Sequence, residues 1–224
     1  MRARLASVAC GLFLAGCLDL GAVPADVNPS TQAPLPPSGK PSWTDGDHWV
    51  QRAYYNDKPE ETLAVYDYYV QGTTSLETGG SSYNTLKVIV QEGNLSFWLT
   101  VPDVRLAREA NGTQARDYAP PCDAYPATLA AQASWTHECR RLGTMIPNPA
   151  STDALTSLVE AQGNVEVPAG TFQAWRIRTT GEGASYTEFY APGACFPAKV
   201  VVEGNRTIVL DLVAYECRAT SGGR

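Results

Sequence analysis

Apolar and polar residues alternate with a period of two through most of this chain. The stretch 95–101 alternates Leu, Phe, Leu and Val with Ser, Trp and Thr, and 86–90 alternates Leu and Val with Lys and Ile. The stretch 206–215 repeats the pattern after the Gly204-Asn205 turn. Because successive side chains of a strand point to opposite faces, this alternation is typical of amphipathic strands. Clusters of Gly, Pro and Asn bound the runs, so the pattern predicts an antiparallel, mostly β domain.

Few stretches favour a helix. Ala127–Ala133 is the best short candidate, and Ser151–Leu158 could begin as a helical turn capped by Ser151 or Thr152. The sequence therefore predicts an all-β fold with minor α. Pro168 ends one predicted strand because it lacks a backbone donor, and Gly170 permits the positive φ of a tight turn before the next strand.

An internal repeat is a further interpretation of the pattern. Gln71-Gly72 leads into a strand that begins near Tyr83, and Gln162-Gly163 leads into one that begins near Thr171. Two related β-meanders would produce this spacing. Chance similarity between β-hairpins is the alternative.

The amino-terminal residues form an export signal. Arg2 and Arg4 precede a short apolar run, and Leu14-Ala15-Gly16-Cys17 follows it. The run is too short to span a bilayer. The segment resembles a bacterial lipoprotein signal (a lipobox), which implies that Cys17 receives a diacylglyceryl thioether, that residues 1–16 are removed, and that the new terminus is acylated, palmitate being one such group. The alternative is an ordinary secretory signal peptide that is cut later, after Ala25.

The remaining chain divides into three parts. Residues 17–41 read as the lipidated Cys17 and a linker, rich in Pro among Ala, Ser, Thr and Asn, which cannot bury enough surface to fold. Residues 42–217 form the β-domain, and residues 218–224 are a flexible tail. The formal net charge of −6 disfavours nucleic acid as a partner, because that partner requires cationic patches.

Four cysteines remain for the exported domain, and the sequence favours two disulfides. Cys195 and Cys217 flank the predicted carboxyl-terminal hairpin, so folding it brings them together. Cys122 then pairs with Cys139. Zinc is the rival interpretation, but neither C-x-x-C spacing nor a suitably placed histidine supports it, since His137 lies beside Cys139. We therefore expect disulfides, no metal and no cofactor.

The segment Val165-Glu166-Val167-Pro168-Ala169-Gly170-Thr171-Phe172, with Tyr190-Ala191-Pro192-Gly193 and a valine-rich closing hairpin, resembles a set of uncharacterised bacterial envelope lipoproteins. The resemblance spans about residues 43 to 216. It implies an open or half β-barrel, like that of the LolA and LppX lipoprotein carriers, whose curved sheet holds acyl chains. Phe189 stands where the pattern has Trp, and the residues around Cys195 interrupt it. The resemblance supplies no catalytic residue.

Motifs of catalysis are missing from the sequence. It contains no H-E-x-x-H, G-x-S-x-G or G-x-G-x-x-G, and His48 and His137 are expected as surface strand residues. Aromatic residues are the stronger signal. Tyr66, Tyr68 and Trp98 are weak candidates for ligand contacts, although most aromatic residues of an all-β protein pack in its core.

Together these observations predict a non-enzymatic lipoprotein anchored to the cell envelope through Cys17. In a diderm bacterium the outer membrane is favoured, because no aspartate directly follows Cys17. We expect a binding protein that holds an apolar ligand in a curved sheet. The alternative is a scaffold lipoprotein with a packed core that docks to another envelope protein.

Overall fold

Strands make up nearly all of the regular structure. The computed structural model describes residues 35, 38–92, 94–123, 125–143, 150–181 and 184–218. Within these ranges no α-helix occurs, and the 3-10 turn Pro192–Ala194 leads into β13. No helix of the described residues is long and apolar enough to cross a membrane. The strands are β1 Ser38–Gly39, β2 His48–Tyr55, β3 Lys58–Thr78, β4 Ser81–Val90, β5 Leu95–Thr100, β6 Arg105–Asn111, β7 Gln114–Asp123, β8 Thr128–Leu129, β9 Ser134–Gly143, β10 Ala150–Val167, β11 Gly170–Gly181, β12 Ala184–Ala191, β13 Phe196–Val202 and β14 Ile208–Glu216.

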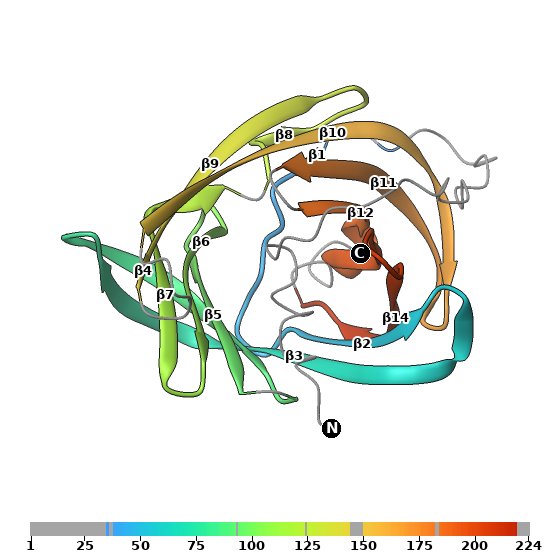
Figure 1. Ribbon diagram of the computed structural model, residues 1–224, viewed down its shortest axis with the longest axis horizontal. Helices are drawn as coiled ribbons and strands as arrows, with labels where there is room; N and C mark the ends of the chain where they lie inside the picture. Colours follow the sequence, from blue (N-terminus) through green and yellow to red (C-terminus); the bar gives the residue numbers. More distant parts are fainter. Residues whose placement is uncertain are drawn as a thin grey trace.

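Twelve of these strands form one antiparallel barrel. The order is β10-β11-β12-β13-β14-β2-β3-β4-β5-β6-β7-β9, and β9 pairs back with β10 (Figure 1). This arrangement confirms the prediction of an all-β, antiparallel, barrel-type sheet. The pairing of β7 with β9 is the shortest in the ring among the described residues, with Arg116–Tyr118 set against Arg141–Gly143.

Both stretches proposed as helical are strands or loops. In the second stretch, Leu155, Ser157 and Val159 are buried and the residues between them are exposed, so the period is two and the segment belongs to β10. In the first, Thr128–Leu129 forms β8 and pairs with β1. The prediction of minor α is therefore wrong for these stretches, because non-local pairing overrides their local preference.

The predicted turns agree with the structure. β10 ends at Val167 and β11 begins at Gly170, whose φ is 130°. The predicted carboxyl-terminal hairpin is β13 paired with β14, in which Val200 lies opposite Leu210.

The core lies between strands that curl over one another. Both faces of β13 and β14 are buried, as the neighbours Val200 and Val201 and the neighbours Val209 and Leu210 show. The end of the β10–β11 hairpin bends onto β14, where the backbone N–H of Ala169 donates to the carbonyl of Leu212. Figure 1 shows this curl in the orange and red strands.

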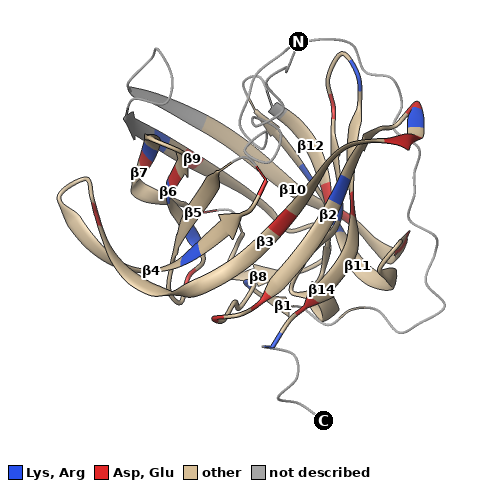
Figure 2. Cartoon of the chain, turned by 90° about the horizontal axis from the view of Figure 1, so that it is seen from below, with Lys and Arg blue, Asp and Glu red and all other residues tan. Residues whose placement is uncertain are grey.

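In the view of Figure 1 the segment before β2 (blue) passes across the ring of strands, and Figure 2 shows β1 and β8 toward one end of the barrel. β1 pairs with β8, and the Trp43 indole donates to the Cys195 carbonyl at 2.7 Å. β1 lies inside the range that the sequence assigns to the linker, so this end of the linker is part of the fold. The backbone N–H of Arg218 donates to Asp47 at 2.7 Å, which ties the start of the predicted tail to the turn before β2.

Basic and acidic residues are interspersed over the strands (Figure 2). Several form ion pairs across neighbouring strands, among them Arg108–Asp117 and Arg176–Glu160.

Candidate functional site

Of the three aromatic residues proposed as ligand contacts, Tyr66 and Tyr68 lie together, with ring centroids 6.4 Å apart, and Trp98 lies apart from them. Tyr66 and Tyr68 are buried, and Tyr68 packs on Phe196 with ring centroids 5.3 Å apart. Trp98 is half-buried beside Lys87 and Arg108, whose cationic groups lie 5.3 and 5.9 Å from its ring. The tyrosines therefore belong to the core, and Trp98 makes cation–π contacts.

Strand geometry explains the separation. Phe97 lies opposite Val88, and Val88 lies opposite Val70. Val70 is two residues from Tyr68, so Phe97 and Tyr68 share one face of the sheet. Trp98 follows Phe97 directly and therefore lies on the opposite face.

The structure contains both disulfides in the pairing that the sequence favours. Cys122 is bonded to Cys139, and Cys195 is bonded to Cys217. The lipidation candidate Cys17 lies outside the described residues.

The most distinctive site is a break in the barrel wall between β7 and β9, called here the seam. The ladder between these strands ends at Tyr118, and Pro120 and Pro121 follow on β7. Proline has no backbone N–H, so the ladder cannot continue past them. The Cys122–Cys139 disulfide, with Cα atoms 5.0 Å apart, joins the two strands beyond that point. A covalent link thus replaces hydrogen bonds along the seam.

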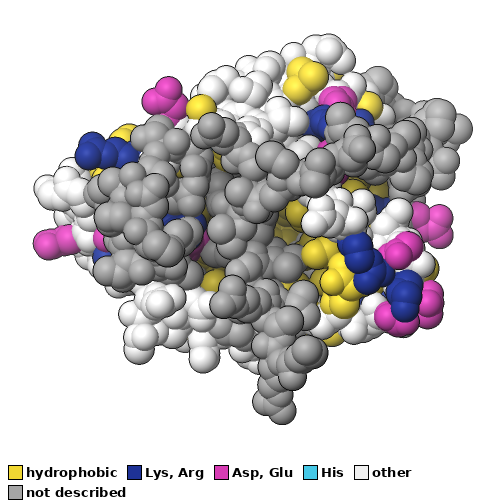
Figure 3. Space-filling view, viewed as in Figure 1, with side chains coloured by type: hydrophobic (Ala, Val, Ile, Leu, Met, Phe, Trp, Pro, Cys, Tyr) yellow, Lys and Arg dark blue, Asp and Glu magenta, His cyan; other side chains and the backbone are white. Residues whose placement is uncertain are grey.

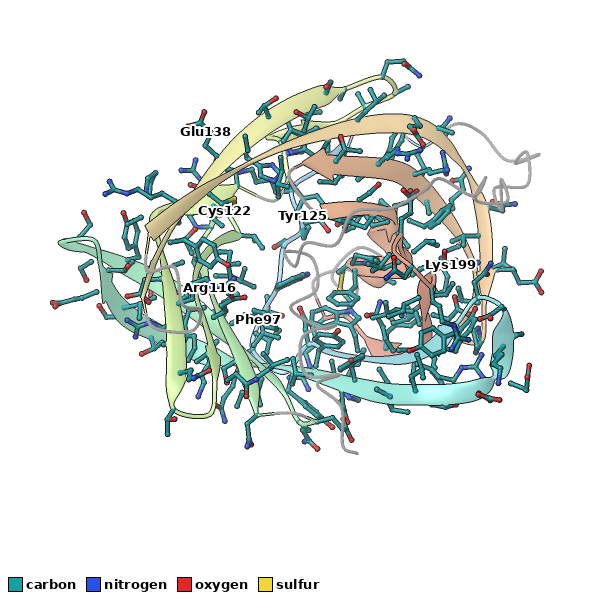
Figure 4. The ribbon with its side chains drawn as sticks, viewed as in Figure 1. Phe97, Arg116, Cys122, Tyr125, Glu138 and Lys199 are labelled. Atoms are coloured by element: carbon teal, nitrogen blue, oxygen red, sulfur yellow. A yellow bond between two sulfur atoms is a disulfide. The ribbon has the colours of Figure 1, made fainter. Side chains whose placement is uncertain are left out.

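A cavity of about 450 Å³ opens at the seam, and we call it the seam cavity. Its walls come from β6, β7, β9, the β7–β8 loop and the segment after β1. In Figure 4 the labelled Glu138 lies outside the ring, whereas Tyr125 lies inside it. The cavity thus reaches from the outer surface toward the interior. The lining residues are Lys40, Arg105, Pro120, Pro121, Asp123, Tyr125, Pro126, Ala127, Trp135, Thr136, His137 and Glu138.

Polar groups of two kinds line the seam cavity. Asp123 accepts a hydrogen bond from Lys40 at 2.8 Å and lies 3.0 Å from the Arg105 Nε, so its charge is matched. The indole Nε1 of Trp135 and the Nδ1 of His137 are buried and have no hydrogen-bond partner among the described residues. A buried polar atom of this kind is costly unless a partner reaches it, which makes both atoms candidates for contact with a ligand.

Tyr125 separates the seam cavity from a buried polar cluster on β11 and β12. Its hydroxyl donates a hydrogen bond to Glu188, and its ring packs on Tyr190 with centroids 5.4 Å apart. Tyr186, on the same face of β12, hydrogen-bonds to Thr179. Burial raises the pKa of Glu188 to about 7, and burial also raises the pKa of Tyr125 well above its ordinary value.

Sequence reasoning missed most of this site. His137 is buried, not a surface residue as expected, and burial lowers its pKa. The Pro120-Pro121 pair was the one available local signal, because two consecutive prolines interrupt a ladder. The approach of β9 and of Lys40 depends on strand pairing far apart in the sequence.

Comparisons with known proteins give only distant likenesses. No family model matches the chain, and no curated protein matches it. One similar solved structure is a protein of Bacteroides fragilis NCTC 9343 described as having a YmcC-like fold, with 11% identity, 80% of this chain and 99% of that chain covered, and a TM-score of 0.46. Another is the hypothetical lipoprotein YmcC of Escherichia coli (K12), with 9% identity, 75% of this chain and 84% of that chain covered, and a TM-score of 0.42. At these TM-scores, the function proposed below rests on the chain's own residues.

Proposed function

We propose that this protein is a non-catalytic, lipid-anchored binding lipoprotein of the cell envelope, and that its ligand occupies the seam cavity. The lipobox around Cys17 supports the anchor. The single observation that supports ligand binding is the seam cavity itself, where a wall without a hydrogen-bond ladder meets unpartnered polar atoms.

The lining indicates the kind of ligand. Pro120, Pro121, Tyr125 and Trp135 provide apolar and aromatic contact area, while the Trp135 indole offers a donor that lacks an acceptor. A volume of about 450 Å³ lies within the range of about 300–1,000 Å³ that is usual for small-molecule sites. A mainly apolar ligand that carries one hydrogen-bond acceptor fits these walls.

Two acidic groups at or near the seam cavity, Asp123 and Glu188, are poorly placed to act as a general acid or base. Asp123 is held between Lys40 and Arg105, so its charge is already matched. Glu188 is not among the residues that line the seam cavity, and Tyr125 lies between them. A general acid or base must come within hydrogen-bond reach of the reacting group.

Native mass spectrometry of the mature lipoprotein, released from detergent micelles, tests ligand binding. We expect an extra mass on the wild type that extracts into organic solvent and that Trp135→Ala reduces. Trp98→Ala is the matched control, because Trp98 lies outside the seam cavity, and it should keep the extra mass. A clean apo mass after incubation with envelope lipid extract would argue for the scaffold alternative. In that case the side chains to crosslink are the exposed apolar ones, which are Val65, Val101, Leu158, Val213 and Tyr215. Figure 3 shows hydrophobic side chains beside charged ones on one face of the molecule.

Fractionation tests the anchor separately. Cys17→Ser should release the protein from membranes that have been washed in high salt, because the acyl chains supply the stable attachment. Retention of Cys17→Ser in the washed membranes would contradict lipid anchoring and would leave the binding proposal untouched.

A further inference from the structure

His137 lies against the disulfide that closes the seam. One ring nitrogen of His137 and the sulfur atoms of Cys122 and Cys139 all lie within 4.8 Å of one another, and all three residues are buried. His137 and Cys139 are two residues apart on β9, so strand geometry puts them on the same face. A gap of one residue between His137 and Cys139 counts against a metal site in a loop or helix. On a strand, this gap suits two ligands of one metal ion.

The surroundings of His137 point to a missing partner. Its Nδ1 is buried without a hydrogen bond among the described residues. The residue also lines the seam cavity, which gives solvent and small ions access to the ring. Within the described ranges, no other group of three or more His, Cys, Asp and Glu side chains has its ligand atoms close enough to share one ion.

We infer that Cys122, Cys139 and His137 form a Zn²⁺ site when the seam disulfide is reduced. A thiol reductant supplies two electrons: two R–SH groups and the Cys122–Cys139 disulfide give two cysteine thiols and one R–S–S–R disulfide. Zn²⁺ then displaces one proton from each thiol into solvent. Water from the seam cavity completes a tetrahedral Cys₂His site.

The charge balance suits the location. Two thiolates and a neutral imidazole around Zn²⁺ carry no net charge, so the site can remain buried without an unpaired ion. Disulfide and metal are then alternative crosslinks of the same two strands, at the place where the ladder between them has ended.

Metal titration of the mature lipoprotein under anaerobic conditions tests the site. Co²⁺ is the spectroscopic probe, because tetrahedral Co²⁺–thiolate sites show charge-transfer and d–d absorption. We expect the reduced wild type to bind one Co²⁺ with these bands, to release it to Zn²⁺, and to bind none when oxidised. His137→Ala should weaken Zn²⁺ binding by about tenfold or more.

The second disulfide provides the matched control. Cys195→Ser/Cys217→Ser should keep the tetrahedral bands, and Cys122→Ser should lose them while its circular dichroism remains that of a β protein. Equal affinity in His137→Ala and wild type would overturn the proposal, because any dithiol would then suffice. Bands that depend on Cys195 or Cys217, or a reduced wild type that stays folded and takes up no metal, would overturn it as well.

Discussion

The hydroxyl of Tyr125 donates a hydrogen bond to the carboxyl of Glu188 and thereby joins the loop after β7 to the middle of β12. Both residues are buried, with 8% of their surface exposed in each case. The hydrogen bond favours the ionised carboxylate, but burial outweighs it. The protonation of Glu188 is therefore linked to the packing of the wall of the seam cavity.

The first prediction concerns pH. Burial raises the pKa of Glu188 from its ordinary 4.5 to about 7, so the folded protein holds one proton more than the unfolded chain between these values. The free energy of unfolding should fall as pH rises through this window, by about 3 kcal/mol in total. Glu188→Gln should abolish this fall, and it should be more stable than wild type at pH 8 but similar near pH 4. Urea unfolding across the pH range measures the effect.

Two further variants sharpen that measurement. Glu166 is exposed on β10, so Glu166→Gln should leave the pH profile of the wild type unchanged. Tyr125→Phe removes a donor to the carboxylate, which raises the folded pKa of Glu188 and should extend the fall in stability to higher pH. Parallel profiles for Glu188→Gln and wild type would show that Glu188 titrates normally.

The strands and turns that the sequence predicts correctly follow from local patterns of a few neighbouring residues. β5 begins at Leu95, where the alternating stretch 95–101 begins, and the turn between Val167 and Gly170 follows from one proline and one glycine. Alternation defines a strand because the two faces of a sheet differ in polarity. Both helical predictions failed because short alanine-rich or serine-capped stretches lack a decisive period, and pairing with distant strands decided their structure.

The candidate site depends on pairing between strands that are far apart in the sequence, so the sequence alone could not predict it. Lys40 meets Asp123 only because β1 pairs with β8, and Trp135 reaches the seam cavity only because β9 follows β10 around the ring. The disulfide pairing could be predicted, because a hairpin brings Cys195 to Cys217 and leaves Cys122 to pair with Cys139. The burial of His137 could not be predicted, because a lone histidine on an alternating strand shows no preference for either face of the sheet.

The second prediction separates the two disulfides. Cys122–Cys139 closes a loop of 17 residues and replaces a missing ladder. Cys122→Ala/Cys139→Ala should lower the free energy of unfolding by about 3 kcal/mol, as chain entropy predicts for this loop size. It should also speed hydrogen exchange of amides in β9. Cys195→Ala/Cys217→Ala should destabilise the protein without that local effect, and equal exchange in β9 for both variants would refute the structural role of the seam disulfide.

The third prediction concerns Trp49. Its side chain is fully buried, stacks on Phe196 with centroids 4.8 Å apart, and donates to the Ala194 carbonyl at 2.8 Å. Trp49→Phe keeps an aromatic ring, but the Ala194 carbonyl loses its hydrogen-bond donor. The smaller ring also leaves a small void beside that carbonyl. The cost should be about 2–4 kcal/mol in urea unfolding. Trp98→Phe, at a half-buried site, should cost less than about 1 kcal/mol, and similar losses for both would contradict this assignment of the core.

The last prediction concerns the buried ion pair of Glu109 and Arg116, whose side chains are directly opposite on β6 and β7 with N and O 2.7 Å apart. Their exposed fractions are 0% and 7%, so neither charge has ready access to water. Glu109→Gln leaves the Arg116 charge buried without its counter-ion and should cost about 3–5 kcal/mol.

The double variant Glu109→Leu/Arg116→Met shows whether the loss of stability in Glu109→Gln comes from an unmatched buried charge or from the loss of a stabilising ion pair. If the loss in Glu109→Gln comes from an unmatched buried charge, removing both charges should recover most of the stability, because the desolvation penalty disappears with the pair. Asp57→Asn is the exposed control, since it breaks the surface pair with Arg206 and should cost less than about 1 kcal/mol. If the double variant is as unstable as Glu109→Gln, the pair itself contributes net stability, and the barrel depends on charge as well as on apolar packing.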